Sequence, residues 1–137
     1  MLRLACAAAL AAGLALLPVA AASNRGPARL RVTERDFSIK APKQVRAGDV
    51  ELIVHNKGPA SHELIVVREG DGGLPLRSDG LTVDEEALEQ REAGALEPGT
   101  AGATRKLDVH LGSGRYVLFC NMSGHYLGGM RTVLVVR

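Results

Sequence analysis

The sequence predicts an all-β fold, a sandwich or a small barrel, because short β-branched runs recur between turn residues. Apolar and polar residues alternate over residues 50–55, and the aliphatic run within residues 63–68 is too continuous for a strand with one face in water. The length of 137 residues allows one domain. Apolar residues make up 46% and charged residues 23%, which is typical of a globular protein and argues against disorder.

The expected strands follow one another with clear turn signals between them. Turns are expected at residues 47–49, 56–59 and 112–114, which are rich in Gly, Asn and Pro. A stretch with Pro42 interrupts the pattern, which resumes at Val45. The expected strands are residues 30–33, 37–39, 50–55, 63–68, 105–111, 115–120 and 131–136.

Residues 69–104 break this rhythm and predict a long loop that carries a short helix. Five glycines and prolines fill the first part, residues 70–80. Thr82 is expected to cap a helix over residues 83–90, whose first turn is acidic as the helix dipole favours. The charge run of this helix indicates a solvated face rather than a metal site.

Residues 1–22 have the features of a secretory signal peptide. Arg3 supplies a short positive region, residues 4–22 carry no charge, and the stretch ends in three small alanines. An uncleaved membrane anchor is the alternative, because nineteen uncharged residues nearly span a bilayer. A lipoprotein modified at Cys6 is excluded, since almost no hydrophobic region precedes it. We therefore expect a signal peptide at 1–22, a lead-in with the first strand at 23–36, and the main domain at 37–137, in the periplasm.

Charge gives no sign of a nucleic-acid partner. The formal net charge is +2, from 17 basic and 15 acidic residues, and no basic run of five residues occurs. Removal of the signal peptide leaves Cys120 as the single cysteine. In a secreted protein such a residue indicates an intermolecular disulfide, a free thiol or a metal-bound thiolate.

The residues that carry chemistry lie close together near the C-terminus. Cys120, His125 and Met130 fall within eleven residues in the pattern C-x4-H-x4-M. A thiolate and two imidazoles with a weak axial thioether suit copper electron transfer. The second histidine is expected from a distant strand, and His62 qualifies because it begins an apolar run. Zinc is disfavoured, because thioethers bind it poorly and structural zinc sites use several cysteines.

Three further residues near these patterns are not expected to bind metal. His55 and His110 lie in strand patterns without a partner at ligand spacing. Met122 is expected to pack near the site.

At these residues the sequence resembles the cupredoxins, the blue (type 1) copper proteins. The resemblance covers residues 37–136, and the ligand loop is most similar to those of rusticyanin and sulfocyanin. It implies an eight-stranded Greek-key β-sandwich, with His62, Cys120 and His125 as equatorial ligands and Met130 as the axial ligand of one copper ion. Two positions depart from the family pattern: Glu63 replaces an asparagine and Ser123 a proline.

The expected function is that of a monomeric periplasmic one-electron carrier, not an enzyme. His125 is expected nearest the surface, where residues 126–129 give a small apolar patch for a redox partner such as a c-type cytochrome. A copper carrier or scavenger without a redox role is the alternative. A thiol hydrolase lacks a recognisable acid to orient its histidine, and a copper enzyme with a second, histidine-rich site has too few histidines, because only His55 and His110 remain.

Overall fold

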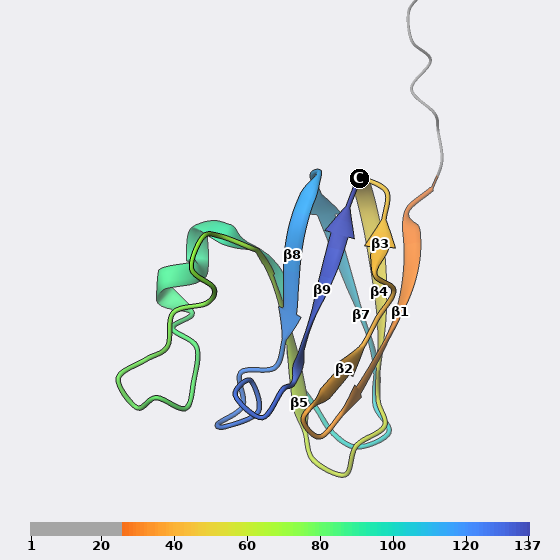
Figure 1. Ribbon diagram of the computed structural model, residues 1–137. Coiled ribbons are helices and arrows are strands. Elements are labelled where there is room, and N and C mark those ends of the chain that lie inside the picture. Colours follow the sequence, from red (N-terminus) through yellow and green to blue (C-terminus); the bar gives the residue numbers. More distant parts are fainter. Residues whose placement is uncertain (1–25) are drawn as a thin grey trace, which may run out of the picture.

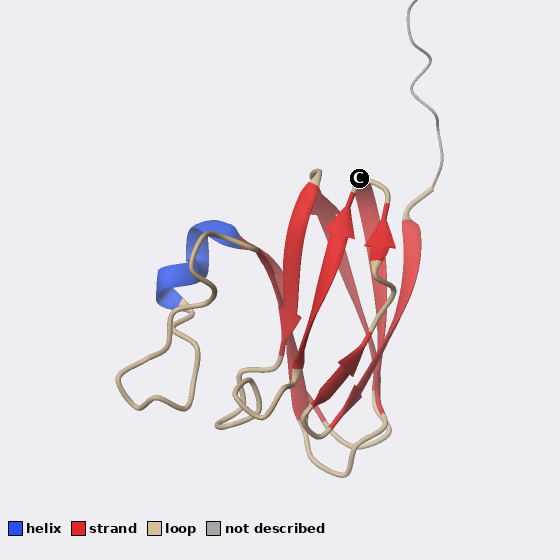
Figure 2. Ribbon diagram, in the orientation of Figure 1, coloured by secondary structure: helices blue, strands red, loops and turns tan. Residues whose placement is uncertain are grey.

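The computed structural model describes residues 26–137, which form two β-sheets packed face to face (Figure 1). The first sheet has the order β2-β1-β4-β7 and the second the order β3-β9-β8-β5-β6. Strands account for nearly all regular structure (Figure 2), so the prediction of an all-β sandwich is confirmed. The elements are β1 (Ala28–Arg35), β2 (Ser38–Lys40), β3 (Gln44–Val45), β4 (Gly48–Asn56), β5 (His62–Arg68), η1 (Glu86–Arg91), β6 (Glu92–Gly99), β7 (Thr104–Leu111), β8 (Gly114–Phe119) and β9 (Arg131–Val136).

The resemblance implied eight strands, and the described residues form nine because the segment 38–45 changes sheets. Its first part, β2, pairs with β1, and its second part, β3, pairs with β9. Pro42 lies between the two parts and has no N–H to donate to a ladder, which favours the break at this point. Neighbouring strands in each sheet are often distant in sequence, as in a Greek-key sandwich.

The main core lies between the two sheets. Val50, Leu52 and Val54 of β4 are buried and alternate with partly exposed residues, as expected for a strand with one buried face. The run in β5 is buried on both faces. Leu64 and Val66 point into the main core. Ile65 and Val67 point to the other face and join a second cluster with Phe119. Residues 69–91, which we call the excursion, cover the outer face of the second sheet. Both faces of β5 are therefore covered, which explains its continuous aliphatic pattern.

The helix in this excursion differs from the prediction. It is a 3₁₀ helix over Glu86–Arg91, and no side chain caps its start. Thr82 instead belongs to a turn in which its hydroxyl donates to Asp79 Oδ2 at 2.9 Å. The backbone N–H of Val83 donates to Asn121 Oδ1 at 2.6 Å, so tertiary contacts hold the segment that was expected to begin the helix.

Strand β6 was missed by the sequence analysis, which placed these residues in the long loop. It pairs antiparallel with β5 at the edge of the second sheet. Gly94 and Pro98 give it low strand propensity, but an edge strand tolerates proline. Gly94 also fits close packing, because a Cβ there would lie 3.0 Å from Val109 Cγ1.

Strand β1 is an integral part of the first sheet, where it pairs in parallel with β4 over seven residue pairs from Ala28↔Val50 to Glu34↔Asn56. Among residues 26–137, no helix is long and apolar enough to cross a membrane. The predicted signal peptide, with Cys6, lies outside the described residues.

Candidate metal centre

The four predicted ligands come from three segments that meet at one end of the sandwich. His62 is the first residue of β5, Cys120 directly follows β8, and Met130 directly precedes β9. His125 lies in the loop between Cys120 and Met130, which we call the ligand loop. The side chains of His62, Cys120 and Met130 are fully buried, and His125 is partly exposed.

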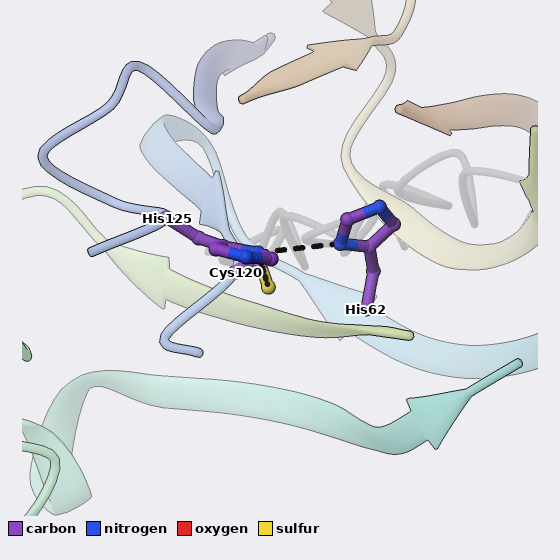
Figure 3. Close-up of side chains that lie close together, drawn as sticks. All are labelled: His62, Cys120 and His125. Carbon is purple, nitrogen blue, oxygen red and sulfur yellow. Dashed lines mark hydrogen bonds between the residues drawn. The ribbon is translucent and has the colours of Figure 1, made fainter. Parts of the chain in front are cut away.

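Three potential ligand atoms converge on one point (Figure 3). A ring nitrogen of His62, a ring nitrogen of His125 and Cys120 Sγ all lie within 4.8 Å of one another. His125 Nδ1 is 3.3 Å from His62 Nδ1 and 3.5 Å from Cys120 Sγ. The fold thus brings His62 to a thiol and an imidazole that follow it by more than fifty residues.

Backbone hydrogen bonds close the ligand loop at its base. Cys120 N donates to Met130 O at 3.1 Å, and Met130 N donates to His125 O at 2.9 Å. Two tight turns fold the loop between these points, with Gly124 at φ 78° and Gly129 at φ 103°. These angles favour glycine, since a Cβ would strain the backbone there. The turns hold His125 in place without the proline that Ser123 replaces.

The loop that precedes His62 is braced by Asn56, which is fully buried. Its side-chain amide donates to Ala60 O at 2.8 Å and to Gly99 O at 2.9 Å. Its Oδ1 accepts a hydrogen bond from Gly58 N at 2.8 Å. Two of these contacts fix the loop from within and the third ties it to β6, so His62 enters the site from a rigid support.

Glu63 and Asn121 link the two ligand-bearing segments. Glu63 Oε1 accepts a hydrogen bond from Asn121 N at 2.9 Å. The backbone N–H groups of Glu63 and Met122 also face the Cys120 sulfur and lower the pKa of its thiol. The carboxylate of Glu63 therefore ties the segments together at the position where the family pattern has an asparagine.

Burial disfavours the charged forms of Cys120 and His62. It raises the pKa of Cys120 to about 11, despite the two N–H groups. Burial also lowers the pKa of His62, an effect that its hydrogen bond with Asp36 only partly offsets. A bound cation is what would favour the thiolate here, since metal ligands must be deprotonated.

The remaining histidines lie elsewhere. His55 Nδ1 is 2.8 Å from Thr104 Oγ1 on the outer face of the first sheet. His110 Nδ1 is 2.7 Å from Asp49 Oδ1 at the end of the sandwich away from His62. Neither belongs to the cluster of three. Met122 packs against the main core next to the site, as the sequence analysis expected.

Asp36 and Phe37 are neighbours of the site that the sequence pattern did not predict. Asp36 Oδ1 is 2.9 Å from His62 Nε2, and the Phe37 ring packs edge-on against His125 with ring centroids 5.4 Å apart. Phe37 was expected to begin a strand, but it lies in the turn before β2 with φ 61°. No sequence motif links these residues to the histidines. They lie near His62 because β1 pairs with β4, whose end leads into the His62 loop.

The chemistry of the donor set selects among metals. A thiol and a thioether favour soft Cu(I), while two imidazoles also support Cu(II). The set at His62, Cys120, His125 and Met130 fits one type 1 copper ion. A structural zinc site would use several cysteines, and Cys120 is the single cysteine among residues 26–137.

No protein-family model matches this sequence, and no match was found among curated proteins. Solved structures do match. Auracyanin B is 22% identical, with a TM-score of 0.62 over 83% of this chain and 92% of that one. Auracyanin A, a "blue" copper protein from Chloroflexus aurantiacus, is 19% identical, with a TM-score of 0.61 over 82% of this chain and 100% of that one.

The chain has the cupredoxin fold.

Rusticyanin from Thiobacillus ferrooxidans extends the comparison. It is 13% identical, with a TM-score of 0.58 over 80% of this chain and 77% of that one. At such identities the likeness establishes the cupredoxin fold alone. The evidence for a metal centre is the convergence of His62, Cys120 and His125 at one end of the sandwich.

Proposed function

We propose that this cupredoxin-fold protein is a type 1 (blue) copper protein that carries single electrons in the periplasm. The observation that carries the proposal is the convergence of one thiol and two imidazole nitrogens within 4.8 Å. His62, Cys120 and His125 would hold the ion as equatorial ligands, with Met130 as the axial ligand. Copper at such a site supplies one-electron exchange between Cu(I) and Cu(II).

Rigidity of the ligands supports an electron carrier. His62, Cys120 and Met130 have no exposed surface, and each is fixed at the end of a strand. The ligand loop is closed by two backbone hydrogen bonds, and the His62 loop is braced by Asn56. A site whose ligands barely move requires little rearrangement when the charge of its ion changes.

The same burial disfavours a copper carrier or scavenger without a redox role. Such a protein must release its metal readily to a chelator or partner. Three buried ligands offer no direct route for exchange, because an incoming group would first have to displace packed side chains. Slow metal release is therefore expected, which fits electron transfer better than copper delivery.

A small apolar surface surrounds the exposed edge of His125, and we propose that a redox partner docks there. Among residues 26–137, four large hydrophobic side chains are exposed, and three of them, Phe37, Leu81 and Leu127, belong to segments at this end of the molecule. Phe37 contacts the His125 ring, Leu81 O accepts a hydrogen bond from Gly124 N at 3.2 Å, and Leu127 lies in the ligand loop. Weak electron-transfer encounters use small interfaces of this kind.

This surface differs from the patch that the sequence analysis expected at residues 126–129. Tyr126 is half-buried, and its ring packs edge-on against Phe119 with centroids 5.6 Å apart. It therefore belongs to the second apolar cluster rather than to the docking surface. We expect the partner, such as a c-type cytochrome, to contact a single copy of this protein at Phe37 and Leu127.

An anaerobic copper titration of the purified protein tests the proposed site. One equivalent of Cu(II) should produce an intense visible thiolate-to-copper band and the narrow copper hyperfine pattern of type 1 sites in electron paramagnetic resonance. Cys120→Ser should abolish the band, and His110→Ala, a histidine at the other end of the sandwich, should keep it. A wild-type protein without the band, or a Cys120→Ser variant that retains it, would overturn the proposal.

Competition with a Cu(I) chelator separates the two copper functions. An electron carrier should retain copper over hours at micromolar chelator, because its ligands are buried. Release within seconds would favour the carrier or scavenger.

A further inference from the structure

A single two-residue turn contacts both histidines of the candidate centre. Asp36 and Phe37 connect β1 to β2, and they are far in sequence from the ligand loop. Asp36 Oδ1 lies 2.9 Å from His62 Nε2, while the Phe37 ring packs against His125. The turn therefore supports both imidazole rings of the centre.

The contact with Asp36 determines which ring nitrogen of His62 carries the proton. Nε2 faces the carboxylate, and Nδ1 faces the cluster, 3.3 Å from His125 Nδ1 (Figure 3). A carboxylate accepts hydrogen bonds but does not donate them, so the proton of the neutral ring lies on Nε2. The lone pair of Nδ1 then points toward Cys120 and His125, where a metal ion would use it.

The surroundings show that this contact is built into the fold. The His62 side chain is fully buried, and the Asp36 side chain is 35% exposed. A Cβ on Gly58 would lie 2.6 Å from Asp36 Oδ1 and 2.8 Å from His62 Nε2, so the loop can pass here only with glycine. Lys57 N donates to Glu34 O at 2.8 Å, which ties that loop to the end of β1.

The backbone of the turn is itself unusual. Phe37 adopts φ 61°, a left-handed conformation that bulky residues rarely take and that strains the backbone. The antiparallel pairs Glu34↔Ile39 and Arg35↔Ser38 hold the turn on both sides. Strand pairing thus stabilises a strained turn whose two side chains both reach histidines.

We propose that Asp36 is the positioning residue for His62, fixing its Nε2–H tautomer and adding a negative charge that favours the cupric state. Only the effect of Asp36 on the cupric state rests on the proposed copper function. The tautomer is a property of the metal-free protein and is measurable without copper.

The charge of Asp36 has a direct consequence for the reduction potential. An anion that hydrogen-bonds a ligand makes that ligand a stronger donor, which stabilises the more highly charged metal ion. Loss of such a partner commonly lowers metal affinity about 10- to 100-fold. If the affinity for Cu(II) falls tenfold more than that for Cu(I), the reduction potential rises by about 59 mV, since one electron is exchanged.

The first experiment uses the metal-free wild-type protein at pH 7. Two-dimensional nitrogen-15 NMR of the histidine rings should show His62 as the Nε2–H tautomer. Asp36→Ala, which removes the acceptor, should shift the ring toward a mixture of tautomers. Asp36→Asn can still accept from Nε2–H through its amide oxygen, and it should keep the wild-type tautomer.

The second experiment measures the reduction potential and the affinities for Cu(I) and Cu(II). Asp36→Asn should raise the potential, with the Cu(II) affinity reduced at least tenfold more than the Cu(I) affinity. Asp49→Asn is the matched control: it removes the same charge from another His–Asp contact, that with His110 at 2.7 Å, at the opposite end of the sandwich. That variant should keep the wild-type potential.

The outcomes separate this proposal from the proposed function. An Nδ1–H tautomer in the wild-type protein, or equal potentials in Asp36→Asn and Asp49→Asn, would overturn the role of Asp36. A purely structural role would lower the unfolding midpoint and leave both tautomer and potential unchanged. Absence of the thiolate-to-copper band in the wild type would instead contradict the copper function, and the NMR result would still decide the tautomer.

Discussion

Asn121 and Val83, separated by 38 residues in sequence, are joined by a pair of hydrogen bonds that imitate the pairing of two strands. Val83 N donates to Asn121 Oδ1 at 2.6 Å, and Asn121 Nδ2 donates to Val83 O at 3.0 Å. The same amide also donates to Glu85 Oε1 at 2.6 Å. One side chain next to Cys120 thus holds the excursion, residues 69–91, against the end of the sandwich where the candidate ligands meet.

Replacement of Asn121 should therefore loosen the excursion. Asn121→Ala leaves the buried N–H and C=O of Val83 without partners, which costs about 1–3 kcal/mol in the free energy of unfolding. Urea unfolding monitored by circular dichroism measures this loss. Ser123→Ala, an exposed neighbour in the ligand loop, is the control and should match the wild type. Equal unfolding midpoints for the two variants would show that the Asn121 contacts do not stabilise the protein.

Glu34 and Arg105 form a buried ion pair that should contribute to stability. Arg105 Nη2 is 2.6 Å from Glu34 Oε2, and the Glu34 side chain has no exposed surface. Burial raises the pKa of Glu34, although Arg105 opposes that effect. Arg105→Met removes the partner of a buried carboxylate and should cost about 3 kcal/mol at neutral pH. Urea unfolding at neutral pH measures the loss.

The pH dependence of that loss has a defined sign. Because the pKa of Glu34 is raised in the folded protein, the folded state binds more protons than the unfolded state, and this favours folding at lower pH. Arg105→Met removes the charge that opposes this rise, so the pKa of Glu34 is raised further in the variant, and the deficit should shrink as the pH falls through that pKa. Lys106→Met, which removes an exposed pair with Glu51, should change stability little. A deficit that stays constant from pH 7 to pH 4 would contradict the assignment.

The docking surface can be tested without knowledge of the partner. Electron self-exchange between reduced and oxidised copies, measured by NMR line broadening, requires two copies to approach through their exposed His125 edges. Leu127→Glu places like charges at that contact and should slow self-exchange at least tenfold at low salt, with partial recovery at high salt. Ser113→Glu, in the turn between β7 and β8 at the other end, should keep the wild-type rate. Equal rates in the two variants would place the contact elsewhere.

Copper should stabilise the folded protein, because the unfolded chain does not bring His62 to the ligand loop. A ligand at 1,000 times its dissociation constant adds about 4 kcal/mol to the free energy of unfolding. Thermal unfolding under reducing conditions should show a higher midpoint with Cu(I) than without it. Cys120→Ala should lose this increase. An increase that persists in Cys120→Ala would indicate that copper binds elsewhere.

The sequence allowed much of the fold to be predicted because the pattern of β-branched residues is local. The strands around Val50 and Ile65 were recognised from their alternation or continuous burial. Strand β6 was not recognised, because Gly94 and Pro98 are poor strand formers and only pairing with β5 makes them a strand. The helix was misplaced because the Asp84 N–H, which the local rule assigns to a capping Thr82 side chain, donates instead to Pro75 O.

The ligand loop could be predicted from the sequence, since Cys120, His125 and Met130 lie in one short segment whose turns are encoded locally. The sequence also indicated His62, but only as a residue at the start of an apolar strand. The tertiary structure alone decided that His62 lies 3.3 Å from His125 and that Asp36 lies against its other nitrogen. Those contacts depend on strand pairings between distant segments, and no local pattern of residues records which strands will be neighbours.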